Sequence, residues 1–226
     1  MRIRPAGSRL PTKAGWLDSK HSFSFGHHYD PQWTGSGALL VINDDTVAPG
    51  AGFGTHGHSD MEIISVVLSG KLTHKDSQGN IGHLLPGMVQ RMSAGTGIRH
   101  SEYNGSDTEH VHFLQIWIRP HSQGLAPSYE EAQVPDQKGK VILAGSGGLM
   151  AINQDAELAQ YRLDAGDEVA FKAESRRKRY LHVIEGGISA GELRLGPGDG
   201  LELSAGEERR FSADGEAWFL AFDVPA

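Results

Sequence analysis

The sequence predicts an all-β protein in which two β-barrels follow one another along one chain. Short segments rich in β-branched and aromatic residues recur throughout its 226 residues. Turn signals separate these segments at intervals of about 8 to 12 residues, as an all-β sandwich or barrel requires. Glycine is frequent, with 30 residues against 10 prolines, which suits a chain with many tight turns. Helical periodicity is weak everywhere.

Composition argues against several classes of protein. No stretch of about 20 apolar residues is present, so no membrane span is expected, and the N-terminus lacks the apolar core of a secretory signal. Cysteine is absent, which excludes disulfides and thiolate ligands and fits a cytoplasmic location. The formal net charge of −7 argues against nucleic-acid binding, and the basic run 175–179 is expected to be a solvated strand edge. We expect a monomer.

The first half contains a series of expected strands separated by turns. Residues 1–10 are expected to be flexible. A turn at 77–80 closes one hairpin, and Pro86-Gly87 marks another turn. The expected strands are 22–25, 38–43, 61–68, 71–75, 89–92 and 111–118.

A change of composition divides the chain. Residues 119–140 have mixed charge and little apolar content, so we expect a linker between an N-terminal domain, 1–118, and a C-terminal domain, 141–226. One helical turn is expected at 155–160. The strands expected after the linker are 141–143, 149–151, 159–163, 168–171, 179–185, 187–195, 201–203 and 218–222.

The two halves share a plan that suggests a duplicated barrel. In the first, a strand ends at Gly70 and a hairpin leads to the turn at Pro86-Gly87. In the second, Gly186 and Pro197-Gly198 take the same places. The second copy has only His182 near this segment, so we expect the C-terminal domain to bind no metal.

A metal site is expected in the first half. His56 and His58 are two residues apart among glycines, and His100 and Glu102 repeat that spacing. Residues two apart on a strand point the same way, so three imidazoles and one carboxylate converge if the two segments pair. Four such ligands leave about two positions open in a six-coordinate sphere and suit iron, copper, nickel or zinc. The remaining positive charge favours anionic oxygen donors such as a phenolate.

Other residues compete with this assignment. Glu62 lies four residues after His58 and has the same strand parity, so it could replace Glu102 as a ligand or orient an imidazole. We favour Glu102 as the ligand. A second His-x-His, formed by His110 and His112, has no partner pair and is not expected to bind metal. The other histidines of this half are expected to be exposed or hydrogen-bonded: His21, His27, His28, His74, His83 and His121.

The segment around the first histidine pair carries a recognisable pattern. Gly50-x5-His56-x-His58-x3-Glu62 matches the first motif of the cupin superfamily, except that the closing Gly70 falls one residue late. The late glycine and the segment PGMVQRMSAGTGIRHSEYN resemble the corresponding sequence of the pirin family. The texts GWLDSKHSFSFGHHYDP and LLVINDDTVAPGAGFGTHGHSDMEIISVVLSG are similar to bacterial pirin-like quercetinases. The resemblance is strong over residues 15–120.

This resemblance implies a bicupin, with two double-stranded β-helix barrels in one chain. The family's ligands, three histidines and one glutamate, fall on His56, His58, His100 and Glu102, which favours a role other than metal ligand for Glu62. The implied activity is quercetin 2,3-dioxygenase, in which a flavonol and dioxygen give a depside and carbon monoxide. Iron is the expected metal, with zinc, copper, nickel, manganese and cobalt as alternatives. Glu102 or Glu62 would take the proton of the flavonol hydroxyl. The candidates for an apolar wall are Phe53, Met92, Phe113 and Trp117.

Two other functions stay open, because the cupin fold hosts many activities. One is a cupin enzyme that acts on another phenolic substrate. The other is a metal-dependent regulatory protein with little turnover, as some pirins are regarded. That second function requires an exposed charged or apolar patch near the site, and the sequence does not reveal one.

Overall fold

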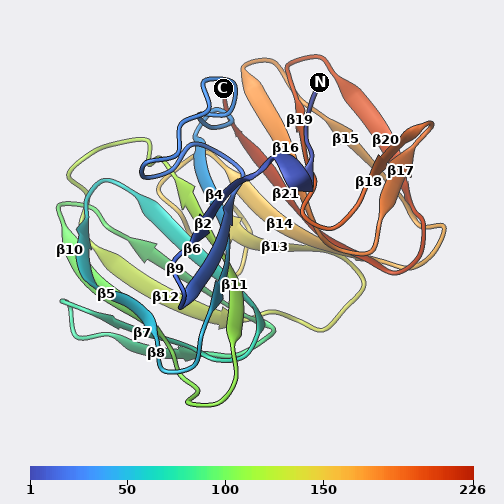
Figure 1. The fold of residues 1–226 in the computed structure, drawn as a ribbon. Helices are drawn as coiled ribbons and strands as arrows, with labels where there is room; N and C mark the ends of the chain where they lie inside the picture. Colours follow the sequence, from blue (N-terminus) through green and yellow to red (C-terminus); the bar gives the residue numbers. More distant parts are fainter.

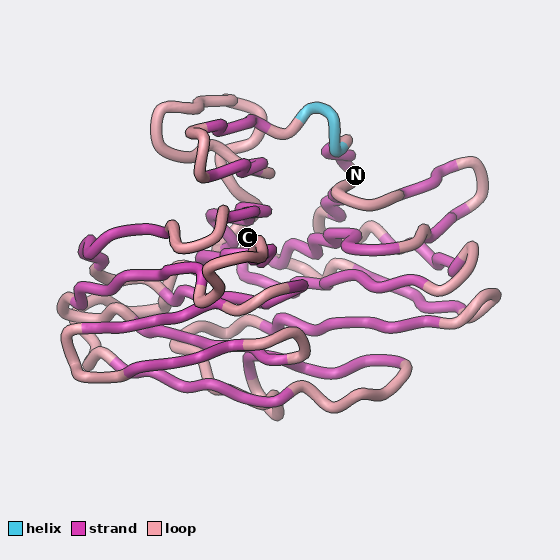
Figure 2. The backbone as a smooth tube through the Cα atoms, turned by 60° about the horizontal axis from the view of Figure 1, so that its bottom comes forward, coloured by secondary structure: helices cyan, strands magenta, loops and turns pink.

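A computed structural model describes all 226 residues and confirms the all-β prediction. It contains 21 strands and one short 3-10 helix, η1 (Ala6–Ser8). Strands and loops account for nearly the whole backbone in Figure 2. No helix has the length and apolar character needed to cross a membrane.

The first half folds from a seven-stranded and a four-stranded sheet. The large sheet contains β2 (Leu10–Lys13), β3 (Leu17–His21), β4 (Leu39–Val47), β6 (Glu62–Ser69), β9 (Met88–Ser93), β11 (Val111–Ile118) and β12 (Ser128–Gln133). Its order is β12-β9-β6-β11-β4-β3-β2. The small sheet contains β5 (Gly52–His58), β7 (Leu72–Asp76), β8 (Ile81–Leu84) and β10 (Ile98–Asn104). Its order is β5-β10-β7-β8.

The second half repeats this plan with a six-stranded and a four-stranded sheet. The large sheet contains β1 (Arg2–Arg4), β13 (Gly139–Gly145), β14 (Glu157–Leu163), β16 (Arg177–Glu185), β19 (Gly200–Leu203) and β21 (Ala217–Pro225), in the order β1-β19-β16-β21-β14-β13. The small sheet contains β15 (Glu168–Lys172), β17 (Ile188–Ala190), β18 (Leu193–Leu195) and β20 (Glu208–Ala213), in the order β15-β20-β17-β18. The two halves lie side by side in Figure 1.

Strand pairing crosses the expected domain boundaries at two points. β1 belongs to the segment expected to be flexible, yet it pairs with β19 of the second half. Arg2 also donates to the buried carboxylate of Glu202. β12 lies inside the expected linker and pairs with β9 of the first half. Both strands lie at the edge of a sheet and have an exposed face, so they are rich in charged and polar residues. For this reason neither shows the apolar pattern by which strands are predicted from sequence. The boundaries at 118 and 141 stay a prediction.

Four local predictions were wrong. The expected strand 187–195 is instead a hairpin of two short antiparallel strands, β17 and β18, because the chain turns at Gly191, which has a φ of 64°. Residues 22–25 form a loop with a single bridge from Phe25 to His28, because β3 ends earlier at His21. Residues 149–151 contribute only one bridge, to Ala144. The expected helical turn at 155–160 is instead the start of β14, which pairs with β21 over its whole length.

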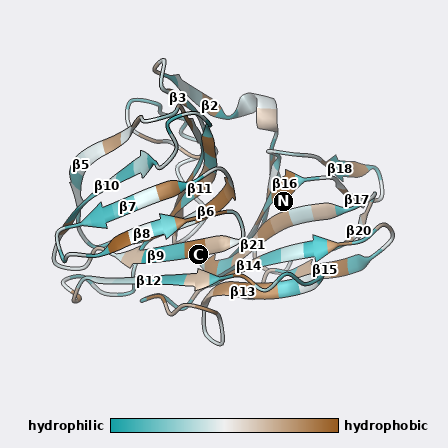
Figure 3. Ribbon diagram, turned by 90° about the horizontal axis from the view of Figure 1, so that it is seen from below, coloured by the Kyte–Doolittle hydropathy of each residue, from teal (hydrophilic) through white to brown (hydrophobic).

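The largest hydrophobic core lies between the two halves. A cluster of 22 buried residues includes Ile42, Ile64 and Ile116 from the first large sheet. The same cluster includes Leu158 and Phe222 from the second large sheet. Apolar colouring is concentrated on β21 and its neighbours in Figure 3. The two barrels therefore pack against one another through the apolar faces of their large sheets.

The interiors of the two barrels differ in polarity. A second cluster of 14 buried apolar residues fills the C-terminal barrel, with Phe171, Phe211 and Phe219 at its centre. The N-terminal barrel has only two small clusters, of 7 and 4 buried residues. Burying polar groups is costly unless they are paired, so the polar interior of the first barrel indicates a functional site. Its buried polar residues include Asn43, Asp45, Ser65, Gln90, Glu102 and Gln115.

An ion-pair cluster ties the N-terminal arm to the first barrel and leads to a stability prediction. Arg9 Nη1 donates to Asp44 Oδ2 at 2.8 Å, and the ring of His112 hydrogen-bonds the same carboxylate. Although burial acts in the opposite direction, these partners hold the pKa of Asp44 well below its usual range. Ionised Asp44 therefore contributes stability above its unfolded pKa of about 3.9, and this contribution is lost as the pH falls toward the folded pKa.

We expect Asp44→Asn to lower the free energy of unfolding at neutral pH by about 2 kcal/mol, because a hydrogen-bonded charge is removed. Near about pH 3 the loss should be smaller, since the unfolded chain then binds the proton as well. Urea denaturation at both pH values measures the difference, with exposed Asp107→Asn as the control. Equal losses at both pH values would contradict the assignment.

Candidate metal centre

The two strands that carry the predicted ligands pair with one another. β5 and β10 are antiparallel, with His100 opposite His56 and a one-residue register shift before Glu102. Gly52 permits the close approach that follows, because a Cβ there would lie 2.4 Å from the carbonyl oxygen of Glu102. On its other side β10 pairs with β7, and His74 lies opposite Glu102. The expected pairing of the two ligand segments is therefore present.

The imidazoles of His56, His58 and His100 converge. One ring nitrogen of each lies within 4.8 Å of the others, and the Nε2 atoms of His56 and His100 are 3.1 Å apart. The Nδ1 atom of His56 lies 2.8 Å from the carbonyl oxygen of Gly54. Because a carbonyl only accepts, Nδ1 donates to it, which leaves Nε2 as the nitrogen that can bind a metal.

The surroundings favour the neutral forms of His58 and His100. Burial, reinforced by neighbouring His56, lowers the pKa of His58 to about 4. Burial also lowers the pKa of His100, and His56 and His58 act in the same direction. A neutral imidazole offers a lone pair to a metal, whereas an imidazolium does not. Nitrogens that converge with lone pairs available fit a divalent cation.

Glu102 lies beside His100 and is held by three hydrogen bonds. Ser65 Oγ and Gln90 Nε2 each donate to Glu102 Oε1 at 3.1 Å, and Gln115 Nε2 donates to Oε2. A carboxylate has about four acceptor positions, so one position on Oε2 stays open. The carboxyl group forms a second set of mutually close ligand atoms with His74 and His100, again within 4.8 Å.

The charge of Glu102 also fits a neighbouring cation. Burial raises the pKa of Glu102 to about 7, and Asp45 acts in the same direction, whereas the three donors oppose the rise. None of these donors carries a charge. A cation next to the open position on Oε2 would offset the cost of burying the ionised carboxylate. His100 belongs to both sets of converging ligand atoms, whereas Glu102 is not grouped with His56 and His58. Imidazole and carboxylate donors of this kind suit a divalent transition metal.

Two aromatic side chains orient the amides that hold Glu102. Tyr129 Oη lies 3.0 Å from Gln90 Oε1 and 3.1 Å from Glu131 Oε2, and it donates its single hydrogen to one of these two acceptors at a time. Trp117 Nε1 donates to Gln115 Oε1 at 3.1 Å. Because each amide oxygen is already occupied, each NH2 group is left to face Glu102. Each oxygen of the Glu102 carboxylate therefore accepts from a glutamine amide that in turn contacts an aromatic side chain.

Tyr129→Phe tests this support. We expect the variant to weaken metal binding roughly tenfold, because hydrogen bonds that orient a ligand are worth about 10- to 100-fold in affinity. The ring of His74 lies 4.7 Å from that of Tyr129, and phenylalanine keeps this stacking. Competition with a chelator of known affinity measures the change. Tyr29→Phe is the matched control, since Tyr29 is 75% exposed; equal affinities in the two variants would contradict the role.

His74 is a residue of the site that sequence reasoning missed. It is completely buried, its Nε2 lies 3.1 Å from Asp76 Oδ2, and its Nδ1 has no partner. The expectation of a hydrogen-bonded histidine was met, but its place beside His100 and Glu102 was not foreseen. The available signal was the spacing of His74 and Asp76, which puts both on one face of β7.

Glu62 belongs to neither set of converging ligand atoms. Ser93 Oγ donates to it at 2.7 Å, and Asn153 Nδ2 of the second half donates to it at 3.0 Å. The expected parity with His58 fails because the chain turns between the two residues, where Asp60 has a φ of 49°. Glu62 therefore stabilises the contact between the halves.

A cavity of about 370 Å³ lies next to the histidine pair and includes His56 and His58 in its lining. Sites for small molecules commonly have volumes of roughly 300–1,000 Å³. Of the four predicted wall residues, Met92 and Phe113 are instead buried in hydrophobic clusters. The aromatic side chains that line the cavity are Trp16, Phe25, Phe53 and Trp117.

Comparison with known proteins gives the family of the chain. The family model described as Pirin matches residues 4–118. This chain belongs to the pirin family. The model described as Quercetinase C-terminal cupin domain matches residues 143–224 of this pirin, which confirms the bicupin prediction together with the paired barrels.

Relatives of this pirin cover nearly its full length. Quercetin 2,3-dioxygenase of Escherichia coli (strain K12) is 40% identical over 226 residues, which are 99% of this chain and 98% of the relative. A pirin-like protein of Caulobacter vibrioides is 43% identical over 193 residues, which are 82% and 83% of the two chains. The crystal structure of the bacterial pirin YhhW from Escherichia coli in complex with nickel(II) is similar with a TM-score of 0.94 and 39% identity, covering 99% of this chain and 98% of that one.

Proposed function

We propose that this pirin is a metal-dependent quercetin 2,3-dioxygenase, which cleaves a flavonol with dioxygen to a depside and carbon monoxide. The convergence of three imidazoles at the edge of an aromatic cavity is the observation that carries this proposal. The relative from Escherichia coli that bears this name is 40% identical over almost the whole chain, which supports a flavonol as the substrate. The partners are then a small aromatic molecule and dioxygen, and the enzyme acts as a monomer.

The proposed metal ligands are His56, His58, His100 and Glu102, with iron as the native metal. Such an ion would supply Lewis acidity toward a substrate hydroxyl and redox chemistry toward dioxygen. The tautomer of His56 and the open position on Glu102 Oε2 support this ligand set.

The aromatic walls bind and orient the flavonol in this proposal. Trp16 and Phe53 meet edge to face with ring centroids 5.2 Å apart, and Phe25 and Trp117 do so at 5.4 Å. Aromatic side chains bury a planar ring at low entropic cost and exclude water from the reacting atoms.

Glu102 is proposed to take the proton of the flavonol 3-hydroxyl at Oε2. That oxygen accepts only from Gln115, whereas Oε1 accepts from both Ser65 and Gln90. A base must lie within hydrogen-bonding reach of the proton that it accepts, so Oε2 would take this proton at the position where it would otherwise hold the ion.

Elemental analysis of the purified protein, together with oxygen uptake and carbon monoxide detection on quercetin, tests the proposal. We expect one carbon monoxide released for each dioxygen consumed, in proportion to the bound metal. Oxidation of quercetin without carbon monoxide would indicate another phenolic reaction. A fully metallated protein that consumes no dioxygen would favour the regulatory function instead.

A further inference from the structure

Two buried polar side chains lie on the β4 wall of the aromatic cavity, and one of them has an oxygen without a hydrogen-bond partner. Asn43 and Asp45 are two residues apart on β4 and both line the cavity, because alternate residues of a strand face the same way. Asp45 is only 2% exposed, and its Oδ1 has no hydrogen-bond partner. Leaving a buried polar atom unpaired is destabilising, so a donor on a bound ligand would supply the hydrogen bond that this carboxyl group lacks.

The amide of Asn43 is oriented by a hydrogen-bond chain. Thr12 Oγ1 lies 2.8 Å from His21 Nε2, and His21 Nδ1 lies 2.7 Å from Asn43 Oδ1. Burial lowers the pKa of His21, although the hydrogen bond to Asn43 opposes this, so the ring is neutral. His21 then donates from Nδ1 and accepts from the threonine hydroxyl at Nε2. With its oxygen occupied, Asn43 has its NH2 group left as a free donor in the cavity lining.

We propose that Asn43 and Asp45 form a subsite for a phenolic hydroxyl group of the substrate. The hydroxyl donates its hydrogen to Asp45 Oδ1 and accepts a hydrogen from Asn43 Nδ2. The identity of the substrate as a polyhydroxylated aromatic rests on the proposed function. In this arrangement one hydroxyl of a planar substrate lies beside the imidazoles. A second hydroxyl of the same molecule binds to Asn43 and Asp45 on β4.

The charge of the subsite suits a neutral hydroxyl better than a cation. Burial raises the pKa of Asp45 to about 7, and Asp44 adds to the rise while Ser19 opposes it. A carboxyl group that is readily neutral at physiological pH does not require a positive partner. The aromatic residues across the cavity, Trp16 and Phe53 among them, provide faces for the ring that carries the hydroxyl.

Anaerobic binding of two flavonols tests the subsite without turnover. Quercetin carries several phenolic hydroxyls, whereas 3-hydroxyflavone keeps only the 3-hydroxyl. Quenching of tryptophan fluorescence reports binding, because Trp16 and Trp117 line the cavity. We expect the wild type to bind quercetin about tenfold more tightly than 3-hydroxyflavone, a difference equal to one good hydrogen bond. In Asp45→Leu this preference should fall to less than about threefold.

Controls separate this subsite from folding and from the proposed reaction. Thr46→Val changes the next residue of β4, which points to the other side of the strand and should keep the wild-type preference. If Asp45→Leu does not fold, Asp45→Ala, which removes the acceptor without adding bulk, replaces it and should also weaken the preference. An unchanged preference in a folded variant overturns the subsite. Absence of carbon monoxide from the aerobic wild type overturns the proposed function, but a preference that depends on Asp45 would still support the subsite.

Discussion

His100→Ala should abolish tight metal binding and reduce flavonol turnover on the order of a thousandfold, the scale of losing a central electrostatic group. His100 belongs to both sets of converging ligand atoms, with His56 and His58 in one and with His74 and Glu102 in the other. Its removal therefore breaks whichever set holds the ion. Metal content by elemental analysis and carbon monoxide release on quercetin measure the two effects.

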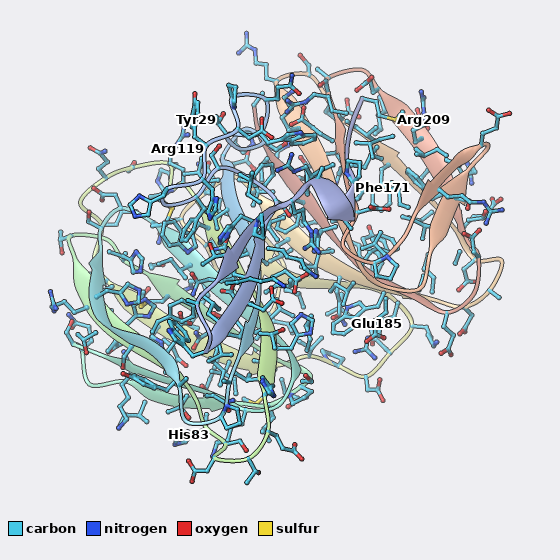
Figure 4. All side chains as sticks on the ribbon, viewed as in Figure 1. Tyr29, His83, Arg119, Phe171, Glu185 and Arg209 are labelled. Carbon is cyan, nitrogen blue, oxygen red and sulfur yellow. The ribbon has the colours of Figure 1, made fainter.

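His83→Ala is the matched control for this variant. His83 is exposed on β8 and lies at the outer end of the first half in Figure 4. It should keep both the metal and the turnover of the wild type. A folded His100→Ala protein with its full complement of metal would remove His100 from the ligand set.

Glu102→Gln should weaken metal binding by about a hundredfold and abolish most turnover, and Glu62→Gln should do neither. The glutamine that replaces Glu102 lacks the negative charge. Its NH2 group would also face the donors of Ser65, Gln90 and Gln115, from which the carboxylate accepts hydrogen bonds. Glu62 instead accepts from Ser93 and Asn153. Its variant should lose stability at the contact between the halves, with a cost of about 1–3 kcal/mol for a disturbed buried acceptor.

The two glutamate variants together decide which carboxylate binds the ion. Metal titration gives the affinities, and thermal denaturation gives the stabilities, so the two kinds of loss are read separately. Loss of metal in Glu62→Gln with full retention in Glu102→Gln would reverse the assignment.

The core of the candidate site could be predicted from local spacing. Strand parity places His56 with His58 and His100 with Glu102, and the pairing of β5 with β10 brings the three imidazoles together. Parity failed only across a turn, at Asp60, where a positive φ of 49° interrupts the strand geometry between His58 and Glu62.

The support of the site could not be predicted in this way. Gln90 and Gln115 come from two strands of the large sheet and meet at one carboxylate, and Tyr129 from a third strand contacts Gln90. Their convergence depends on sheet order and register, which single-sequence periodicity does not encode. β12, which carries Tyr129, was hidden further because its polar, proline-flanked sequence is typical of a linker.

The apolar layer shared by the two barrels has a consequence for how the molecule melts. Since 22 residues drawn from both halves form one cluster, neither half can come apart without uncovering the other. Heating should therefore give one cooperative unfolding transition. A fragment truncated after residue 118 should aggregate, because the apolar face of its large sheet would be exposed to water. The apolar interior of the C-terminal barrel thus stabilises the whole molecule. This stabilisation offsets the cost of the polar residues buried inside the N-terminal barrel.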